Sequence, residues 1–61
     1  MSDYIGTTTE RTKWHGIYIQ EDTFTNGSDF WLVETASSSD KHFVGRRPTD
    51  SEIRRFVDSV S

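Results

Sequence analysis

Two runs of apolar residues in the middle of the chain are typical of β-strands. β-branched and aromatic residues gather between Lys13 and Phe24, and again from about Asp29 to Ala36, as they do in strands. Asn26-Gly27 separates the two runs, and these residue types tolerate the positive φ that a type I′ turn needs at both central positions. The pattern therefore predicts a β-hairpin with Asn26-Gly27 as its two-residue loop.

A shorter third strand is expected after this hairpin. The polar cluster from Ser37 to Asp40 is typical of a loop, and Lys41 to Arg46 has the composition of a strand. Pro48 closes this strand, because proline has no N–H to donate to a strand ladder. Residues 1–12 show no strand or helix period and few apolar anchors. We therefore expect them to form a flexible N-terminal arm.

The C-terminal segment carries the signals of a helix. Thr49 and Glu52 fit a capping box, in which each side chain accepts a hydrogen bond from the other residue's backbone amide. An apolar stripe at helical spacing then predicts a helix from about Asp50 to Val60. Its members are Ile53, Phe56, Val57 and Val60. The expected fold is one small α+β domain over residues 13–61. A three-stranded antiparallel β-meander carries the C-terminal α-helix on one face, in the order β-β-β-α.

Both faces of the predicted sheet carry apolar side chains. A loop at Asn26-Gly27 sets a register in which Ile19 faces Glu34, Tyr18 faces Thr35 and Asp22 faces Trp31. Successive side chains then fall on opposite faces. One face carries Ile17, Ile19, Phe30, Leu32, Ala36 and Phe43, and the other carries Trp14, Tyr18, Phe24, Trp31, Val33, His42, Val44 and Arg46. A one-residue change in the second loop would exchange the faces of the third strand.

One short helix covers only one side of such a sheet, so the other side is expected to stay open. The aliphatic face suits the helix, because Trp and Tyr have polar tips that favour a wet edge. We therefore expect an exposed partner-binding surface, with Arg46 beside Trp31. It consists of Trp14, Tyr18, Trp31 and Val33, rimmed by Gln20, His42 and Arg46. In the alternative interpretation, Trp14 and Phe24 fold over the sheet edge with Tyr4 and Ile5 as a second small core.

Size and composition limit the function. With 61 residues and 7.1 kDa, the chain has room for one small core and no large enclosed active site. No apolar run approaches the roughly 18 residues of a membrane helix, and no leader precedes the domain, so we expect a soluble, unprocessed protein. The absence of cysteine removes disulfides and thiolate chemistry and is compatible with a reducing, cytoplasmic location.

Charge is unevenly distributed along the chain. The net charge is −3. Residues 1–40 hold seven acidic and two basic side chains, whereas residues 41–61 hold three acidic and five basic ones. We expect a bipolar molecule, and the negative total argues against a uniformly basic nucleic-acid-binding surface.

The sequence offers no catalytic or metal-binding pattern. His15 and His42 lack the spacing of metal ligands, and no serine lies in a Gly-x-Ser-x-Gly elbow. Glu21, Asp22 and Asp29 flank the hairpin tip without matching a calcium loop, and turn formation explains them more simply. We therefore expect no enzyme activity, metal or other cofactor, and no small-molecule substrate.

The first functional hypothesis is a small non-catalytic module that binds a protein partner, or a second copy of itself, through the aromatic face. Phages and mobile elements encode compact acidic domains of this kind as inhibitors or regulators of host enzymes. We take the same role as our leading expectation for this chain.

The alternative hypothesis is nucleic-acid binding through the three-stranded sheet, with Lys13, Lys41, Arg46 and Arg47 as the candidate residues. The order of elements is similar to that of integrase arm-binding and plant AP2-type DNA-binding domains, in topology only. Arg46-Arg47 beside a helix N-terminus would also suit an anion. A competing interpretation pairs Arg47 with Asp50 and spaces Asp50 and Arg54 as a helical ion pair.

Overall fold

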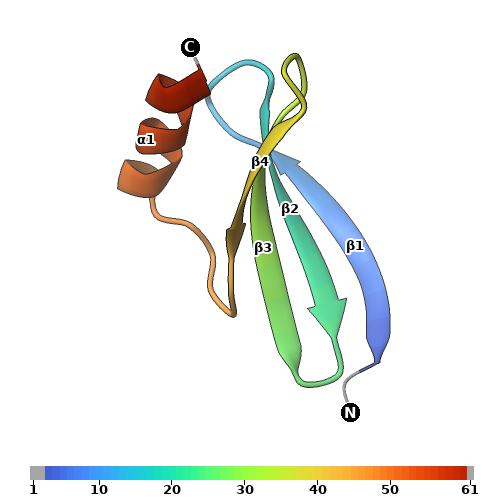
Figure 1. The fold of residues 1–61 in the computed structure, drawn as a ribbon. Helices are drawn as coiled ribbons and strands as arrows, with labels where there is room; N and C mark the ends of the chain where they lie inside the picture. Colours follow the sequence, from blue (N-terminus) through green and yellow to red (C-terminus); the bar gives the residue numbers. More distant parts are fainter. Residues whose placement is uncertain (1–2, 61) are drawn as a thin grey trace.

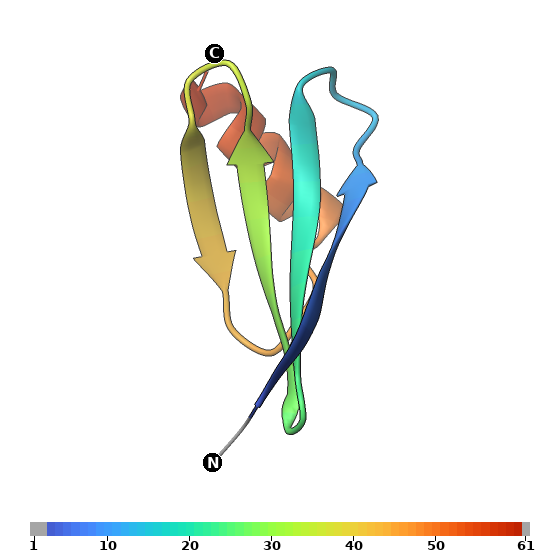
Figure 2. The ribbon, with the colours of Figure 1, turned by 90° about the vertical axis from the view of Figure 1, so that its right-hand side faces the viewer.

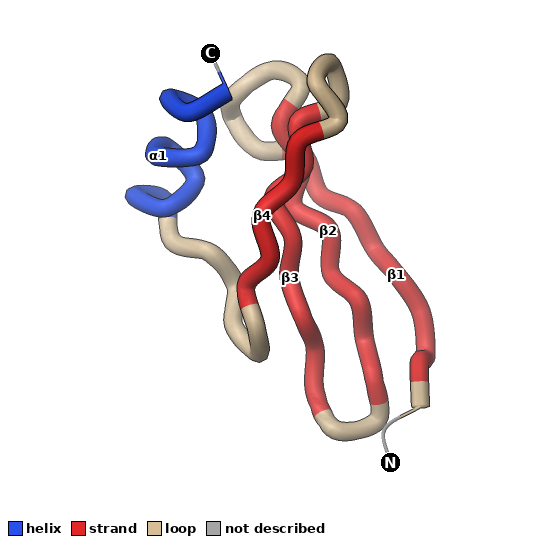
Figure 3. The backbone as a smooth tube through the Cα atoms, in the orientation of Figure 1, coloured by secondary structure: helices blue, strands red, loops and turns tan. Residues whose placement is uncertain are grey.

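A computed structural model describes residues 3–60 as a four-stranded antiparallel sheet with one helix (Figure 1, Figure 3). The strands are β1 (Tyr4–Arg11), β2 (Ile17–Phe24), β3 (Gly27–Glu34) and β4 (Ser39–Phe43), and the helix is α1 (Asp50–Val60). Each strand pairs with the next along the chain. The structure confirms the α+β class, the antiparallel meander and the C-terminal helix. It has one strand more than the three that were expected.

The additional strand, β1, forms where the sequence led us to expect a flexible arm over residues 1–12. It pairs with β2 regularly from Gly6 to Arg11, after an irregularity between Tyr4 and Gly6. Threonine favours extended backbone because its branched Cβ packs well on a pleated surface. The run Thr7-Thr8-Thr9 lacks apolar alternation because β1 is an edge strand with both faces exposed. Residues 1 and 2 of the expected arm lie outside the described residues.

The hairpin between β2 and β3 turns one residue earlier than expected. Its loop is Thr25-Asn26, and Gly27 already pairs with Phe24. Gly27 has φ +145°, and Ser38 is the only non-glycine residue within 3–60 with positive φ. The turn is therefore not the expected type I′. Contacts with Asp3, the residue before β1, fix this turn, because Thr25 N–H donates to the Asp3 carbonyl at 3.0 Å and Asp3 N–H donates to Thr25 Oγ1 at 3.1 Å.

The earlier turn shifts the register of the hairpin by two residues, so that Ile19 lies opposite Leu32 instead of Glu34. Because side chains alternate with a period of two, a shift of two residues leaves every side chain on the same face. The predicted division of β2 and β3 into two faces is therefore confirmed although the predicted pairs are wrong.

Strand β4 also begins earlier than expected, at Ser39 instead of Lys41. The Glu34 carboxylate accepts hydrogen bonds from the backbone N–H groups of Ala36 at 3.0 Å and Ser37 at 2.7 Å, which closes a tight turn after β3. These bonds hold the pKa of Glu34 below its ordinary value of 4.5. The turn is thus set by a glutamate side chain that the sequence pattern assigned to the strand.

The end of β4 differs from the expectation as well. Phe43 ends the strand opposite Phe30, on the face where it was expected. The chain then bends over residues 44–46, where Gly45 takes φ +72°. Val44 and Arg46 therefore lie outside the strand in which they were predicted.

Helix α1 packs on one face of the sheet and builds the core there. Figure 2 shows the sheet from the opposite side, with the helix behind it. The buried apolar side chains are Ile17, Ile19, Leu32, Phe43, Ile53 and Phe56, and Trp14, Phe30, Val57 and Val60 pack against them in partly buried positions. Leu32, at 0% exposure, lies at the centre. The predicted helix face and the aliphatic sheet face are thus confirmed as the core.

The predicted capping box begins α1. Thr49 N–H donates to Glu52 Oε1 at 2.9 Å, and Glu52 N–H donates to Thr49 Oγ1 at 3.3 Å. The first bond of the helix backbone follows, from Ile53 N–H to the Thr49 carbonyl at 2.9 Å. The reciprocal bonds satisfy amides that a helix N-terminus otherwise leaves without partners.

Candidate binding face

The sheet face opposite α1 is not covered by any segment within residues 3–60, and we call it the open face (Figure 2). The strand registers place its side chains in rows that cross the sheet. The central row is Thr9, Gln20, Trp31 and His42, the row on one side is Arg11, Tyr18, Val33 and Asp40, and the row on the other is Thr7, Asp22 and Asp29. Tyr18, Trp31, Val33 and His42 therefore share one face, as the sequence predicted.

Trp31 and His42 form the centre of the open face. Their rings stack with centroids 4.3 Å apart and planes inclined by 12°. His42 Nε2 lies 3.4 Å from Asp29 Oδ2, and Asp29 Oδ1 accepts the backbone N–H of Gly45 at 3.2 Å. The imidazole is thus held between an indole and a carboxylate. This arrangement presents a flat aromatic surface on two neighbouring strands.

A shallow hollow of about 270 Å³ lies beside this aromatic pair. It is lined by Thr9, Tyr18, Gln20, Val33 and Thr35. Its lining includes the ring of Tyr18, the methyl groups of Val33 and two threonine side chains, so it combines apolar surface with a few hydroxyl and amide groups. Such a lining accepts an apolar side chain of a partner and offers hydrogen bonds around it.

The charges of the open face are mostly negative. Asp22, Asp29 and Asp40 lie on it, against the single arginine Arg11. Asp22 Oδ1 accepts hydrogen bonds from Thr7 Oγ1 at 2.8 Å and from Gln20 Nε2 at 3.1 Å, so this carboxylate is held in place. The open face therefore carries more acidic than basic side chains.

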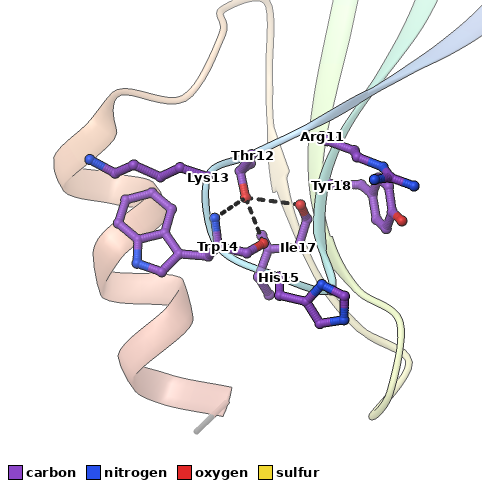
Figure 4. Close-up of a pocket in the computed structure, with 8 residues that line it drawn as sticks. Arg11, Thr12, Lys13, Trp14, His15, Ile17 and Tyr18 are labelled. Atoms are coloured by element: carbon purple, nitrogen blue, oxygen red, sulfur yellow. Dashed lines mark hydrogen bonds between the residues drawn. The ribbon is translucent and has the colours of Figure 1, made fainter.

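Trp14 does not lie on the open face, where it was predicted. It belongs to the loop between β1 and β2 and packs against the helix-side core. Figure 4 shows the Thr12 hydroxyl that shapes this loop. It donates to the Ile17 carbonyl at 2.9 Å and contacts the Trp14 backbone N–H and carbonyl at 3.2 Å each. The expected strand from Lys13 therefore begins only at Ile17, and the loop carries Trp14 over to the helix.

Arg46 is likewise not beside Trp31, because the chain leaves the sheet after Phe43. Its guanidinium forms a two-point ion pair with the Glu52 carboxylate, with both N–O distances 2.6 Å, and lies 5.4 Å from the centre of the Phe43 ring. This pairing and the Thr49 N–H lower the pKa of Glu52 from 4.5 to about 2. Arg46 thus supports the helix cap rather than the open face.

The other basic candidates also lie on the helix side of the sheet. Arg47 pairs with Glu10 at 2.6 Å, instead of with Asp50 as the competing interpretation had it. Lys41 lies opposite Leu32, with its Nζ 5.6 Å from the centre of the Phe43 ring. Lys13 Nζ is 4.7 Å from the Trp14 ring. The four residues proposed for nucleic-acid binding therefore do not gather on the open sheet face.

Of the contacts expected for a second small core, the described residues show one. The rings of Tyr4 and Phe24 meet edge to face, with centroids 5.8 Å apart. Ile5 is 65% exposed, and Trp14 packs elsewhere. This contact closes the hairpin end of the open face and leaves its centre uncovered.

Sequence reasoning missed Thr9, Arg11, Asp29 and Asp40 as members of the open face. Thr9 and Arg11 belong to β1, which carries no apolar alternation, and Asp40 was assigned to a loop. Asp29 was interpreted as a turn-forming residue, so its contact with His42 was not predicted. A threonine run before a strand was the one available signal, since threonine favours strands.

Other parts of the surface offer less. A hollow of about 200 Å³ follows the β1–β2 loop from Arg11 to Tyr18 (Figure 4). Within residues 3–60, no group of three or more His, Cys, Asp or Glu side chains is placed to hold a metal ion. Helix α1, at 11 residues, is too short to cross a membrane, and no described helix is long and apolar enough to do so.

Comparison with known proteins gives no assignment. No protein-family model, no curated protein and no solved structure matches this chain.

Proposed function

We propose that this protein is a non-catalytic binding module that docks on a partner protein through the open face. One observation carries the proposal: a stacked Trp31-His42 pair lies beside a hollow on a sheet face that no described segment covers. Aromatic side chains at the centre of an exposed patch are typical of protein interfaces. A module of this size acts by occupying its partner's surface, as an inhibitor or regulator does.

The open face indicates the chemistry of that partner. The hollow suits one apolar side chain, and Asp22, Asp29 and Asp40 around the centre suit lysine or arginine. Complementary charge raises the rate of association and excludes acidic surfaces. The expected partner surface is therefore an aliphatic or aromatic residue flanked by basic ones.

The two tryptophans allow a test with an internal control. Trp31 lies on the open face and Trp14 lies against the helix, so one sample carries a reporter on each side. Peptides are first selected from a displayed random library on the immobilised protein. The selected peptide is then titrated into labelled protein while the two indole N–H signals are followed by NMR. We expect the Trp31 indole to shift and the Trp14 indole to stay.

The Trp31→Ala variant completes this test. It should lose at least tenfold in affinity for the selected peptide, because a central aromatic anchor carries much of the binding energy. A mixed pool of single- and double-stranded oligonucleotides is titrated in parallel at low and moderate salt. Salt-sensitive shifts of the Trp31 indole with oligonucleotides, and none with peptides, would overturn the proposal in favour of nucleic-acid binding.

A further inference from the structure

The outer edge of β1 is a second surface with unused binding capacity. Strand β1 is the first strand of the sheet order, so no described strand pairs with its outer side. It is eight residues long, with its two charged residues, Glu10 and Arg11, at its C-terminal end, and from Tyr4 to Thr9 it contains no charge and no proline. Long uncharged edges invite pairing with another strand, and proteins usually interrupt them. The opposite edge is protected in that way, since β4 has five residues, including Asp40 and Lys41.

The backbone of β1 shows which residues offer hydrogen bonds outward. Thr12 N–H donates to the Ile17 carbonyl of β2 at 3.1 Å. Because N–H and C=O groups alternate in direction along an antiparallel strand, Thr8 and Glu10 also face β2. Thr7, Thr9 and Arg11 therefore direct their N–H and C=O groups away from the sheet.

We propose that two copies of this chain pair through β1, antiparallel and centred on Thr9. The regular pairing of β1 with β2 runs from Gly6 to Arg11, and Thr9 is the middle one of the three outward-facing residues Thr7, Thr9 and Arg11. In this register the outward-facing residues meet one another: Thr9 faces the Thr9 of the second copy, and Thr7 faces its Arg11. All three outward groups on each copy then form ladder hydrogen bonds.

Charge complementarity supports the second copy as the occupant of this edge. Arg11 is exposed and forms no ion pair within the described part of the chain. Across the two-fold axis it lies opposite Thr7, whose own neighbour on β2 is Asp22. The Cα atoms of Arg11 and that Asp22 are then about 10 Å apart, two strand spacings, which a long arginine side chain spans. Each dimer contains this contact twice.

No like charges oppose each other in this register. Glu10 faces Thr8 of the second copy, and its carboxylate is already neutralised by Arg47 at 2.6 Å. The two Thr9 side chains form the central pair, and a cross-strand threonine pair is favourable. The result is an eight-stranded sheet in which the two open faces form one continuous surface. The pairing does not depend on the proposed protein-binding function, because it uses the backbone of β1 rather than Trp31.

The test compares Thr9→Pro with Thr9→Val. Proline removes the outward N–H of Thr9 without breaking a bond to β2, and valine keeps both the N–H and the branched shape. Sedimentation equilibrium of the wild type and of Thr9→Val should show a mass that rises with concentration to twice 7.1 kDa. The Thr9→Pro variant should dissociate about tenfold more readily, because each dimer loses two hydrogen bonds. Equal dimerisation of all three proteins, or a wild type monomeric at millimolar concentration, would overturn the proposal.

A measurement on the wild type alone tests the pairing even if the Thr9→Pro variant does not fold. Amide hydrogen exchange is followed by NMR at low and high protein concentration. We expect the amides of Thr7, Thr9 and Arg11 to exchange more slowly at high concentration, while Glu10 changes little because it already bonds to β2. Unchanged exchange at the three outward amides would contradict the pairing. The Trp31→Ala variant should dimerise as the wild type does, which separates this result from the test of the open face.

Discussion

Trp14 and Trp31 contact different parts of the molecule, and this difference sets what their removal should cost. Trp14 packs against the core beneath the helix, with the Lys13 ammonium 4.7 Å from its ring. Trp31 contacts His42 on a face that no described segment covers. The same residue type therefore packs against the core in one position and lies on the open face in the other.

We expect Trp14→Ala to lower the free energy of unfolding by about 2–3 kcal/mol, since it leaves a void beside the core. Trp31→Ala should cost about 1 kcal/mol or less, the worth of one exposed ring contact. Urea denaturation followed by circular dichroism measures both. Equal losses in the two variants would mean that Trp31 is part of the core and that the open face is covered.

At the scale of elements, helix α1 depends on one acidic side chain. Glu52 accepts hydrogen bonds from the Thr49 N–H of the capping box and from the two terminal guanidinium nitrogens of Arg46, Nη1 and Nη2. It thereby links the helix N-terminus to the bend that follows β4. The strand, the bend and the helix are connected through a single carboxylate.

The low pKa of Glu52 makes the stability of the protein depend on pH. The folded-state pKa of about 2 lies below the ordinary 4.5, so ionised Glu52 favours the folded state. This contribution is complete above about pH 5 and is lost as the pH falls toward 2. Glu34, whose pKa is also lowered, acts in the same direction. Thermal melts from pH 7 to pH 2 should therefore show a falling melting temperature.

The Glu52→Gln variant should melt lower than the wild type at pH 7 and show a shallower decline between pH 5 and pH 2. The Asp58→Asn variant is the matched control. Its ion pair with Arg54 has a distance of 3.5 Å and joins two side chains that are about two-thirds exposed, so its loss should leave the decline unchanged. A decline as steep in Glu52→Gln as in the wild type would contradict the role assigned to Glu52.

The elements differ in how far the sequence could predict them. The helix and its cap were predictable because both signals are local: the stripe from Ile53 to Val60 and the Thr49-Glu52 pair. The faces of β2 and β3 were predictable because a period of two survives a register shift of two. The turns were not predictable. The turn between β2 and β3 is fixed by Asp3, which is distant in the sequence, and the turn after β3 is fixed by glutamate, which is not a typical turn residue.

The site was predictable to the same degree. The open-face positions of Tyr18, Trp31 and Val33 followed from strand alternation across the hairpin, and that of His42 also required the assumed length of the second loop. Trp14 and Arg46 were misplaced because each lies just beyond the end of a strand, where alternation no longer applies. The contribution of β1 was missed because an exposed edge strand carries no apolar period.

The whole molecule is elongated, with extents of 38 × 20 × 16 Å. Eight-residue strands are about 27 Å long, whereas the 11-residue helix is about 16 Å long. The helix therefore covers only part of its sheet face, and the hairpin end extends beyond it (Figure 1). The helix-facing positions toward that end are Thr8, Glu21, Thr23 and Ser28. This geometry explains how a chain with only 31% hydrophobic residues forms a core.

Pairing of every strand with its successor has a consequence for the speed of folding. Each step closes a short loop, so little chain entropy is lost before the next contact forms. We expect most of the dilute protein to refold in a phase on the order of milliseconds, measured by stopped-flow fluorescence at 280 nm excitation. A main phase that lasts seconds at low concentration would contradict this expectation.

Rapid pairing of successive strands also affects the risk of aggregation during translation. The threonine-rich segment of β1 and the aromatic residues of β2 and β3 are the segments most prone to unwanted association before they pair. β1, β2 and β3 are complete before the helix sequence is made, so the sheet can assemble in the order of translation. The meander topology thus shortens the time for which these segments remain unpaired.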